Sequence, residues 1–129
     1  MDIGITVRLD APFEEAVERT RAALKEQGFG VLTEIDVQAT LREKLGEQME
    51  RYLILGACNP PLAHRALGVD RRIGLLLPCN VVVREGDGAT LVEALDPEIM
   101  VDATGEPGFT PVAAEAAARL RKALDTLGS

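Results

Sequence analysis

Residues 51–61 read RYLILGACNPP, and this stretch decides the fold of the chain. The run from Tyr52 to Cys58 is apolar throughout, so it lacks the alternating pattern of a strand with one face in water. It predicts a buried strand in the middle of a sheet. Asn59 followed by two prolines is typical of a helix start. We therefore expect a central strand that leads directly into a helix, which ends near Gly68.

The part of the chain before this strand predicts a strand, a helix and a second strand. Apolar side chains alternate with polar or small ones over residues 3–9 and again over 31–37, which is the period of a half-buried strand. Between them, residues 13–27 carry an apolar stripe with acidic residues beside it, which indicates an amphipathic helix. A short helix from Leu41 to Leu45 is also expected.

The part after the central strand predicts a hairpin and a last helix. Residues 73–85 have the composition of a strand, interrupted at Pro78 because proline cannot donate to a strand ladder. A Gly-Asp-Gly turn at residues 86–88 predicts a hairpin with residues 89–94 as its return strand. Residues 96–109 show no clean period and are expected to be a loop. A final helix is predicted to run from Thr110 to Leu127.

Together these elements predict an α+β fold with the order β-α-β-(α)-β-α-β-β-α. Strands joined by a hairpin cannot all be parallel, so the sheet is expected to be mixed or mainly antiparallel. Helices packed on such a sheet form a two-layer sandwich. The 129 residues suit one hydrophobic core, and a single domain over residues 1–129 is expected.

Charge and composition exclude several classes of partner. The formal net charge is −7, and aromatic residues make up only 3% of the chain. Proteins that bind nucleic acids usually gather basic residues on one face and stack bases on aromatic side chains, so no nucleic-acid partner is expected. No apolar run approaches the ~20 residues that span a bilayer, so no membrane partner is expected either.

The two cysteines bear on the location of the protein. Residues 1–4 lack the basic and apolar regions of a secretory signal. Two cysteines in a chain without such a signal indicate free thiols in a reducing compartment. We therefore expect a cytoplasmic protein.

Those cysteines are also the strongest candidates for a functional site. Cys58 and Cys79 each follow an apolar run, and His64, the only histidine, falls in the helix after Cys58. Thiolates and imidazole suit zinc or copper(I), so Cys58, Cys79 and His64 are one hypothetical set of metal ligands. The spacing matches no known metal motif, and a tetrahedral site lacks a fourth ligand. The alternative is that both cysteines are small apolar core residues.

An asparagine follows each cysteine. Asn59 is expected either to cap the helix that starts at Pro60 or to bind a ligand, and capping is the role in which Asn is strongly preferred. Asn80 lies inside an apolar strand, where a buried amide needs hydrogen-bond partners. Those partners are either backbone groups at a bulge or a bound ligand.

Two segments carry a resemblance to a known family. The runs YLILGACNP at residues 52–60 and GLLLPCNVVV at residues 74–83 resemble the signature segments of a bacterial and archaeal domain of unknown function, number 302. The resemblance implies a layered α/β domain similar to that of the TATA-box-binding protein, with a curved antiparallel sheet, and it implies homodimers. It supplies no reaction. The motif positions it covers are Cys58, Asn59, Pro60, Pro78, Cys79 and Asn80.

Three functional hypotheses follow. The first is a homodimeric module that binds a small molecule or a metal near the Cys58-Asn59 and Cys79-Asn80 turns. The second is an enzyme that uses Cys58 as a redox or nucleophilic thiolate, because the start of a helix favours a thiolate. The third is a structural or protein-interaction module without a ligand, supported by the alanine-rich last helix and by more apolar strand surface than one layer of helices covers.

Overall fold

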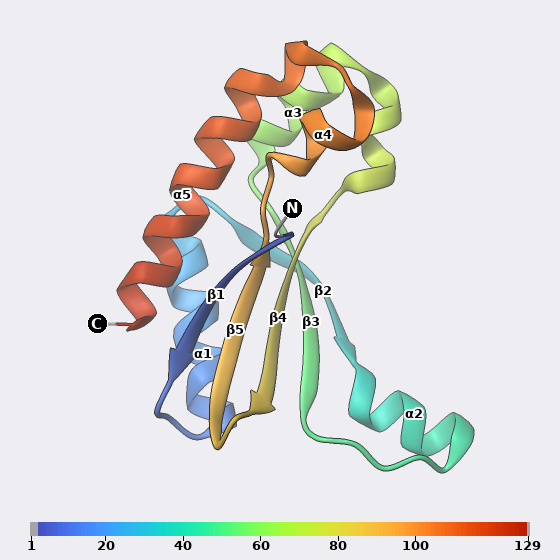
Figure 1. Cartoon of the computed structure of the whole chain (residues 1–129), viewed down its shortest axis with the longest axis vertical. Helices are drawn as coiled ribbons and strands as arrows, with labels where there is room; N and C mark the ends of the chain where they lie inside the picture. The colour runs from blue at the N-terminus through green and yellow to red at the C-terminus, as the bar shows by residue number, and fades with distance from the viewer. Residues whose placement is uncertain (1–2, 129) are drawn as a thin grey trace.

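The computed structural model describes residues 3–128 and has five strands in one antiparallel sheet, in the order β1-β5-β4-β3-β2 (Figure 1). The strands are β1 (Gly4–Leu9), β2 (Gly30–Asp36), β3 (Tyr52–Cys58), β4 (Cys79–Gly86) and β5 (Ala89–Leu95). The helices are α1 (Phe13–Glu26), α2 (Val37–Leu45), α3 (Pro60–Val69), α4 (Ile99–Thr104) and α5 (Thr110–Gly128), with 3-10 helices η1 (Arg71–Leu76) and η2 (Pro107–Phe109). The predicted α+β fold with helices on an antiparallel sheet is confirmed.

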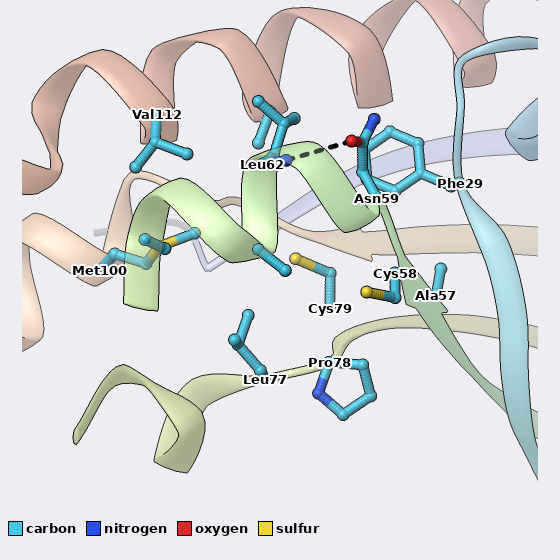
Figure 2. A pocket seen from close by; sticks show the side chains of 13 residues that line it. Phe29, Ala57, Cys58, Asn59, Leu62, Leu77, Pro78, Cys79, Met100 and Val112 are labelled. Carbon is cyan, nitrogen blue, oxygen red and sulfur yellow. Dashed lines mark hydrogen bonds between the residues drawn. The ribbon is translucent and has the colours of Figure 1, made fainter. Parts of the chain in front are cut away.

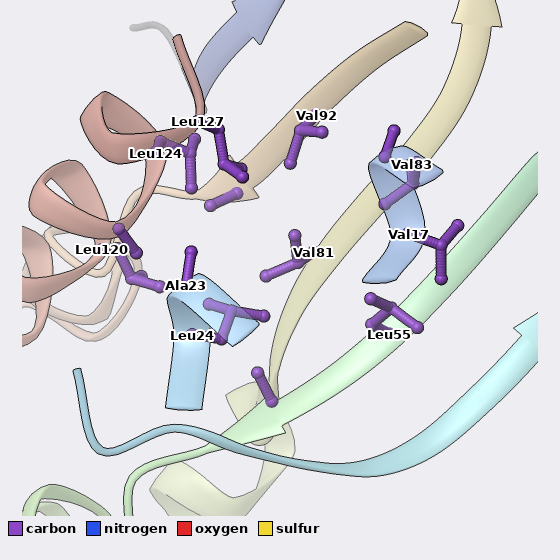
Figure 3. Packing of buried hydrophobic residues seen from close by; sticks show 14 of the residues in the cluster. Val17, Ala23, Leu24, Leu55, Val81, Val83, Val92, Leu120, Leu124 and Leu127 are labelled. Atoms are coloured by element: carbon purple, nitrogen blue, oxygen red, sulfur yellow. The ribbon is translucent and has the colours of Figure 1, made fainter. Parts of the chain in front are cut away.

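One face of the sheet carries the main core. Side chains that alternate along β3, β4 and β5 point toward α1 and α5, and Leu55, Val81 and Val92 are fully buried there. The apolar stripes of α1 and α5 cover them, with Leu24 and Leu120 at the centre (Figure 3). This arrangement confirms the amphipathic first helix and the interior position of β3 in the sheet. Only one face of β3 is buried, however, because Tyr52 and Ile54 on its other face are partly exposed.

A second, smaller cluster sits at one end of the sheet, where α3, α4, η1 and η2 gather around the start of α5 (Figure 1). Its buried members come from all of these elements: Leu62, Ala66, Ile73, Met100, Phe109, Val112 and Ala116. We call this group the end cluster. Because α5 contributes to both clusters, it joins the end cluster to the main core.

Two segments differ from the sequence prediction. Residues 71–76 form η1 and not a strand, because the Asp70 carboxylate accepts the Arg72 N–H at 2.9 Å and starts a tight turn. Strand β4 therefore begins only at Cys79, after a cis Leu77–Pro78 peptide. The predicted loop at residues 96–109 contains α4 and η2, whose Met100 and Phe109 are buried in the end cluster.

The helix α2 stands apart from both clusters. It is longer than predicted because it begins at Val37, where the Asp36 carboxylate accepts the Ala39 N–H at 2.9 Å, and it ends at Gly46 with a left-handed φ of 69°. None of its residues is buried, and Figure 1 shows it projecting beyond β2 and β3. Across residues 3–128, no helix is both long enough and apolar enough to cross a membrane.

Candidate functional site

The fold brings the two cysteines together. Cys58 is the last residue of β3 and Cys79 is the first of β4, and since these strands are antiparallel, both cysteines lie at the same end of the sheet. The apolar run before Cys79 is not a strand as predicted, because η1 takes its place. Ala57 pairs with Cys79, so the cysteine Cα atoms are about 6 Å apart, given about 5 Å between strands and about 3.4 Å per residue.

The two thiols have different surroundings. Cys58 is half-buried and Cys79 is 7% exposed. Burial raises the pKa of the Cys79 thiol to about 11, and the neighbouring Cys58 thiol adds to this rise. Both cysteines line one pocket (Figure 2).

The Asn59 side chain has two structural partners. Its Oδ1 accepts the Leu62 N–H at 3.3 Å, which caps α3, and its Nδ2 donates to the Gln27 carbonyl at 3.3 Å, which ties α3 to the end of α1. The residue is 6% exposed. The expected capping role is confirmed, and the amide is committed to holding the helix rather than to a ligand.

Asn80 lies on the other side of the sheet from Cys79. Successive residues of a strand point to opposite faces, so a buried Cys79 leaves Asn80 exposed beside Tyr52, Val82 and Glu93. The alternation of side chains along a strand could have been applied to the sequence, and it would have placed Cys79 and Asn80 on opposite faces of the sheet. The four residues Cys58, Asn59, Cys79 and Asn80 therefore do not converge on a single site.

His64 does not join the thiols. It is exposed on α3 and is absent from the pocket that Cys58 and Cys79 line. Among residues 3–128, no three His, Cys, Asp or Glu side chains lie close enough together to share a metal ion. The hypothetical ligand set of Cys58, Cys79 and His64 is therefore reduced to two thiols.

The pocket lies between the main core and the end cluster. Phe29 and Ala57 belong to the core, whereas Leu62, Met100 and Val112 belong to the end cluster (Figure 2). Its volume is about 30 Å³, room for one water molecule or one ion. Pockets for organic ligands typically measure about 300–1,000 Å³. The geometry thus favours a single bound atom over a small organic molecule.

Met100 is a pocket residue that the sequence patterns did not single out. It lies in α4, within the stretch predicted to be a loop, and is 5% exposed. The available signal was the short apolar run at residues 99–101 followed by Gly105, since a glycine often ends a helix. Only long-range packing brings Met100 to the same pocket as the two thiols.

A second feature is the sheet face that no helix within residues 3–128 covers (Figure 1). We call it the open face, and it is lined by Tyr52, Ile54, Asn80, Val82, Arg84 and Glu93 from the central strands. Arg84 Nε donates to Glu93 Oε1 at 2.5 Å across this face, and this hydrogen bond raises the pKa of Arg84. Ile35 (50% exposed) and Ile3 (62% exposed) extend its apolar surface toward the sheet edges.

Comparisons with known proteins agree with the resemblance noted above. A family model described as "Domain of unknown function DUF302" matches residues 5–127. A crystal structure of an uncharacterized conserved protein DUF302 from Bacillus stearothermophilus is similar, with 32% sequence identity, a TM-score of 0.93, and coverage of 98% of this chain and 99% of that one. No curated protein matches the chain. From the family match over nearly the whole sequence, we conclude that the chain belongs to the DUF302 family of domains of unknown function.

Proposed function

We propose that the protein is a homodimeric interaction module in which the open face and α2 pack against a second copy of the chain. The observation that carries this proposal is α2, a formed helix without a single buried residue. Helices shorter than about 12–15 residues are marginal in water when isolated, and most helical stability in proteins comes from packing an apolar face. A nine-residue helix that buries none of its residues in its own chain is well explained by a partner.

The apolar residues of α2 support such a contact. Val37, Leu41 and Leu45 are spaced four residues apart and therefore lie on one stripe of the helix. Leu45 is 68% exposed, and on the adjoining strand Leu32 and Ile35 are 69% and 50% exposed. Large apolar side chains exposed on neighbouring elements are typical of interaction sites.

The size of the surface also fits a dimer. Five strands about 5 Å apart and six to eight residues long span roughly 500 Å² in projection. With α2 added, the surface is of the order of the ~800 Å² that each partner buries in a standard stable interface. A two-fold interface uses the same patch on both copies, so one uncovered face is sufficient for both partners.

This proposal also includes a cytoplasmic location. Cys58 and Cys79 are free and adjacent, and adjacent thiols persist in that form in a reducing compartment. The enzyme hypothesis has less support, because His64 lies outside the pocket and Cys58 has no neighbouring base among its wall residues.

Sedimentation equilibrium of the untagged protein from 1 to 100 µM, about the range that separates stable from weak dimers, tests the proposal. We expect a mass of twice 13.8 kDa. The double variant Leu41→Lys/Leu45→Lys is expected to be monomeric and to keep the folded core, because two charges on the stripe oppose packing but disturb no buried residue. A matched control is Leu75→Lys, which changes an 81% exposed leucine on η1, at the other end of the molecule.

Two outcomes contradict the proposal. A wild-type chain that stays monomeric at 100 µM removes the dimer altogether. A dimer that survives Leu41→Lys/Leu45→Lys but dissociates in Leu75→Lys moves the interface to the end cluster.

A further inference from the structure

Three sulfur-containing residues line the pocket between the main core and the end cluster. They are Cys58 at the end of β3, Cys79 at the start of β4 and Met100 in α4. The chain has only two cysteines and three methionines, so all of its thiols and one of its thioethers share a pocket of about 30 Å³. In Figure 2 both thiol sulfur atoms point toward the side on which Met100 lies.

The rest of the pocket wall offers no competing ligand. Its other side chains are aliphatic or aromatic, apart from Asn59. The Asn59 amide is occupied, because its oxygen accepts from Leu62 and its nitrogen donates to Gln27. An ion or molecule bound in this pocket is therefore surrounded by sulfur atoms and hydrocarbon groups.

The type and the number of ligand atoms in the pocket indicate which metal ion it binds. Thiolates and thioethers are soft ligands that favour Cu(I), zinc or iron–sulfur clusters. Zinc sites are almost always four-coordinate and tetrahedral, and only two thiols converge here. Copper(I) is a closed-shell d¹⁰ ion that is stable with two or three sulfur ligands and needs no water, which suits a small apolar pocket.

We propose that this pocket binds one Cu⁺ ion, with the thiolates of Cys58 and Cys79 as its two strong ligands and the Met100 thioether as a weaker third. Binding replaces two S–H bonds by two Cu–S bonds and releases two protons, so the two thiols and Cu⁺ give a site of net charge −1. Copper stays in the +1 state, and no electron is transferred.

The pocket wall holds no other charged group. Apart from the two thiols, no residue that lines the pocket has a titratable side chain. A cation between two thiolates attracts both of them. The pocket shares no residue with the open face, so the copper site does not depend on dimerisation.

The test is a titration of reduced, metal-free protein with Cu⁺ under anaerobic conditions, in competition with a chromogenic Cu(I) chelator. We expect one Cu⁺ per chain. Cys58→Ser and Cys79→Ala are each expected to weaken binding by more than the roughly 10–100-fold that outer-shell changes cost. Met100→Leu keeps the side-chain volume and is expected to weaken binding about tenfold, as for a weak ligand. Met49→Leu, remote from the pocket, is the matched control and is expected to bind like the wild type.

Further measurements separate loss of a ligand from loss of the fold. Far-UV circular dichroism identifies any variant that fails to fold, and the half-buried Cys58 tolerates serine better than the buried Cys79 tolerates change. If Cys79→Ala does not fold, Cys58→Ser and Met100→Leu decide the outcome. Excess Zn²⁺ is expected not to displace the copper.

Three results overturn the inference. They are a wild-type chain that takes no Cu⁺ from the chelator, a folded Cys58→Ser variant that binds Cu⁺ as tightly as the wild type, and full displacement of copper by zinc. Equal affinities of Met100→Leu and Met49→Leu remove Met100 from the ligand set.

Discussion

At the scale of single residues, Cys58 and Cys79 show how similar local sequences acquire different chemistry. Each is followed by asparagine, yet one thiol is half-buried and the other is nearly inaccessible. The difference arises from position in the fold, because Cys79 points into the helix-covered side of the sheet whereas Cys58 lies at a strand end. Asn59 and Asn80 also differ in their surroundings because they occupy different positions in the fold.

The buried thiol predicts a dependence of stability on alkaline pH. The pKa of Cys79 is raised from 9.0 to about 11, so the folded state holds this proton more tightly than the unfolded chain. The resulting stabilisation is complete below pH 9 and is lost as pH rises toward 11, by about 2 to 3 kcal/mol at ~1.4 kcal/mol per pKa unit.

Urea unfolding between pH 8 and pH 11 measures this effect, since that range brackets both values. Cys79→Val removes the titrating group and is expected to flatten the fall in the free energy of unfolding relative to the wild type. Parallel pH curves for the two proteins would show that Cys79 contributes nothing to it.

At the scale of elements, the cap of α3 both starts a helix and holds the pocket wall. The Asn59 side chain spans from Leu62 to Gln27 and is buried. We expect Asn59→Ala to lower the free energy of unfolding by about 1 to 2 kcal/mol, because a cap and a buried partner are lost together. Asp36→Ala removes the equivalent cap of the unburied α2 and is the control. Thermal denaturation that gives equal losses for both variants would contradict this prediction.

Gly56 in β3 marks a close approach between elements. A Cβ at this position would collide with Thr33 Oγ1 and lie 3.0 Å from Pro78 Cγ. Gly56→Ala is therefore expected to destabilise the sheet by about 1–3 kcal/mol, the usual cost of overpacking. Gly30→Ala, at a position with open space beside the same strand, serves as the control in urea unfolding. A Gly56→Ala loss no larger than that of Gly30→Ala would mean that Thr33 moves aside freely.

At the scale of the whole molecule, the fold is asymmetric. Helices α1 and α5 cover one sheet face and the end cluster closes one end, whereas the open face and α2 are left uncovered (Figure 1). This asymmetry separates two surfaces, a buried sulfur pocket and an exposed apolar face. We propose metal binding for the first and self-association for the second.

Hydrogen exchange tests whether α2 is covered by a partner in the wild-type protein. In the wild-type protein we expect protection of the α2 amides, because the proposed partner covers them. In Leu41→Lys/Leu45→Lys, exchange in α2 is expected to become fast while α1 and α5 keep their protection, since local opening follows local burial. Unprotected α2 amides in the wild-type protein would contradict a covered helix.

The sequence by itself determined those features that arise from local interactions. Alternation placed β1 and β2, a continuous apolar run placed β3, and the Gly-Asp-Gly turn placed the hairpin of β4 and β5. The apolar stripes placed α1 and α5, and Asn59 before Pro60 marked the start of α3. It also carried the family membership through the segments at residues 52–60 and 74–83. It did not reveal η1, because GLLL at residues 74–77 has the composition of a strand and only the Asp70 turn prevents one.

The tertiary structure alone decided which residues meet. Cys58 and Cys79 became neighbours through the antiparallel pairing of β3 with β4, and Met100 reached them because α4 folds into the end cluster. His64 and Asn80 were excluded by the direction in which α3 and β4 present them. Periodicity and capping act over a few residues, whereas a binding site depends on pairing and packing between segments distant in the chain, which no local pattern encodes.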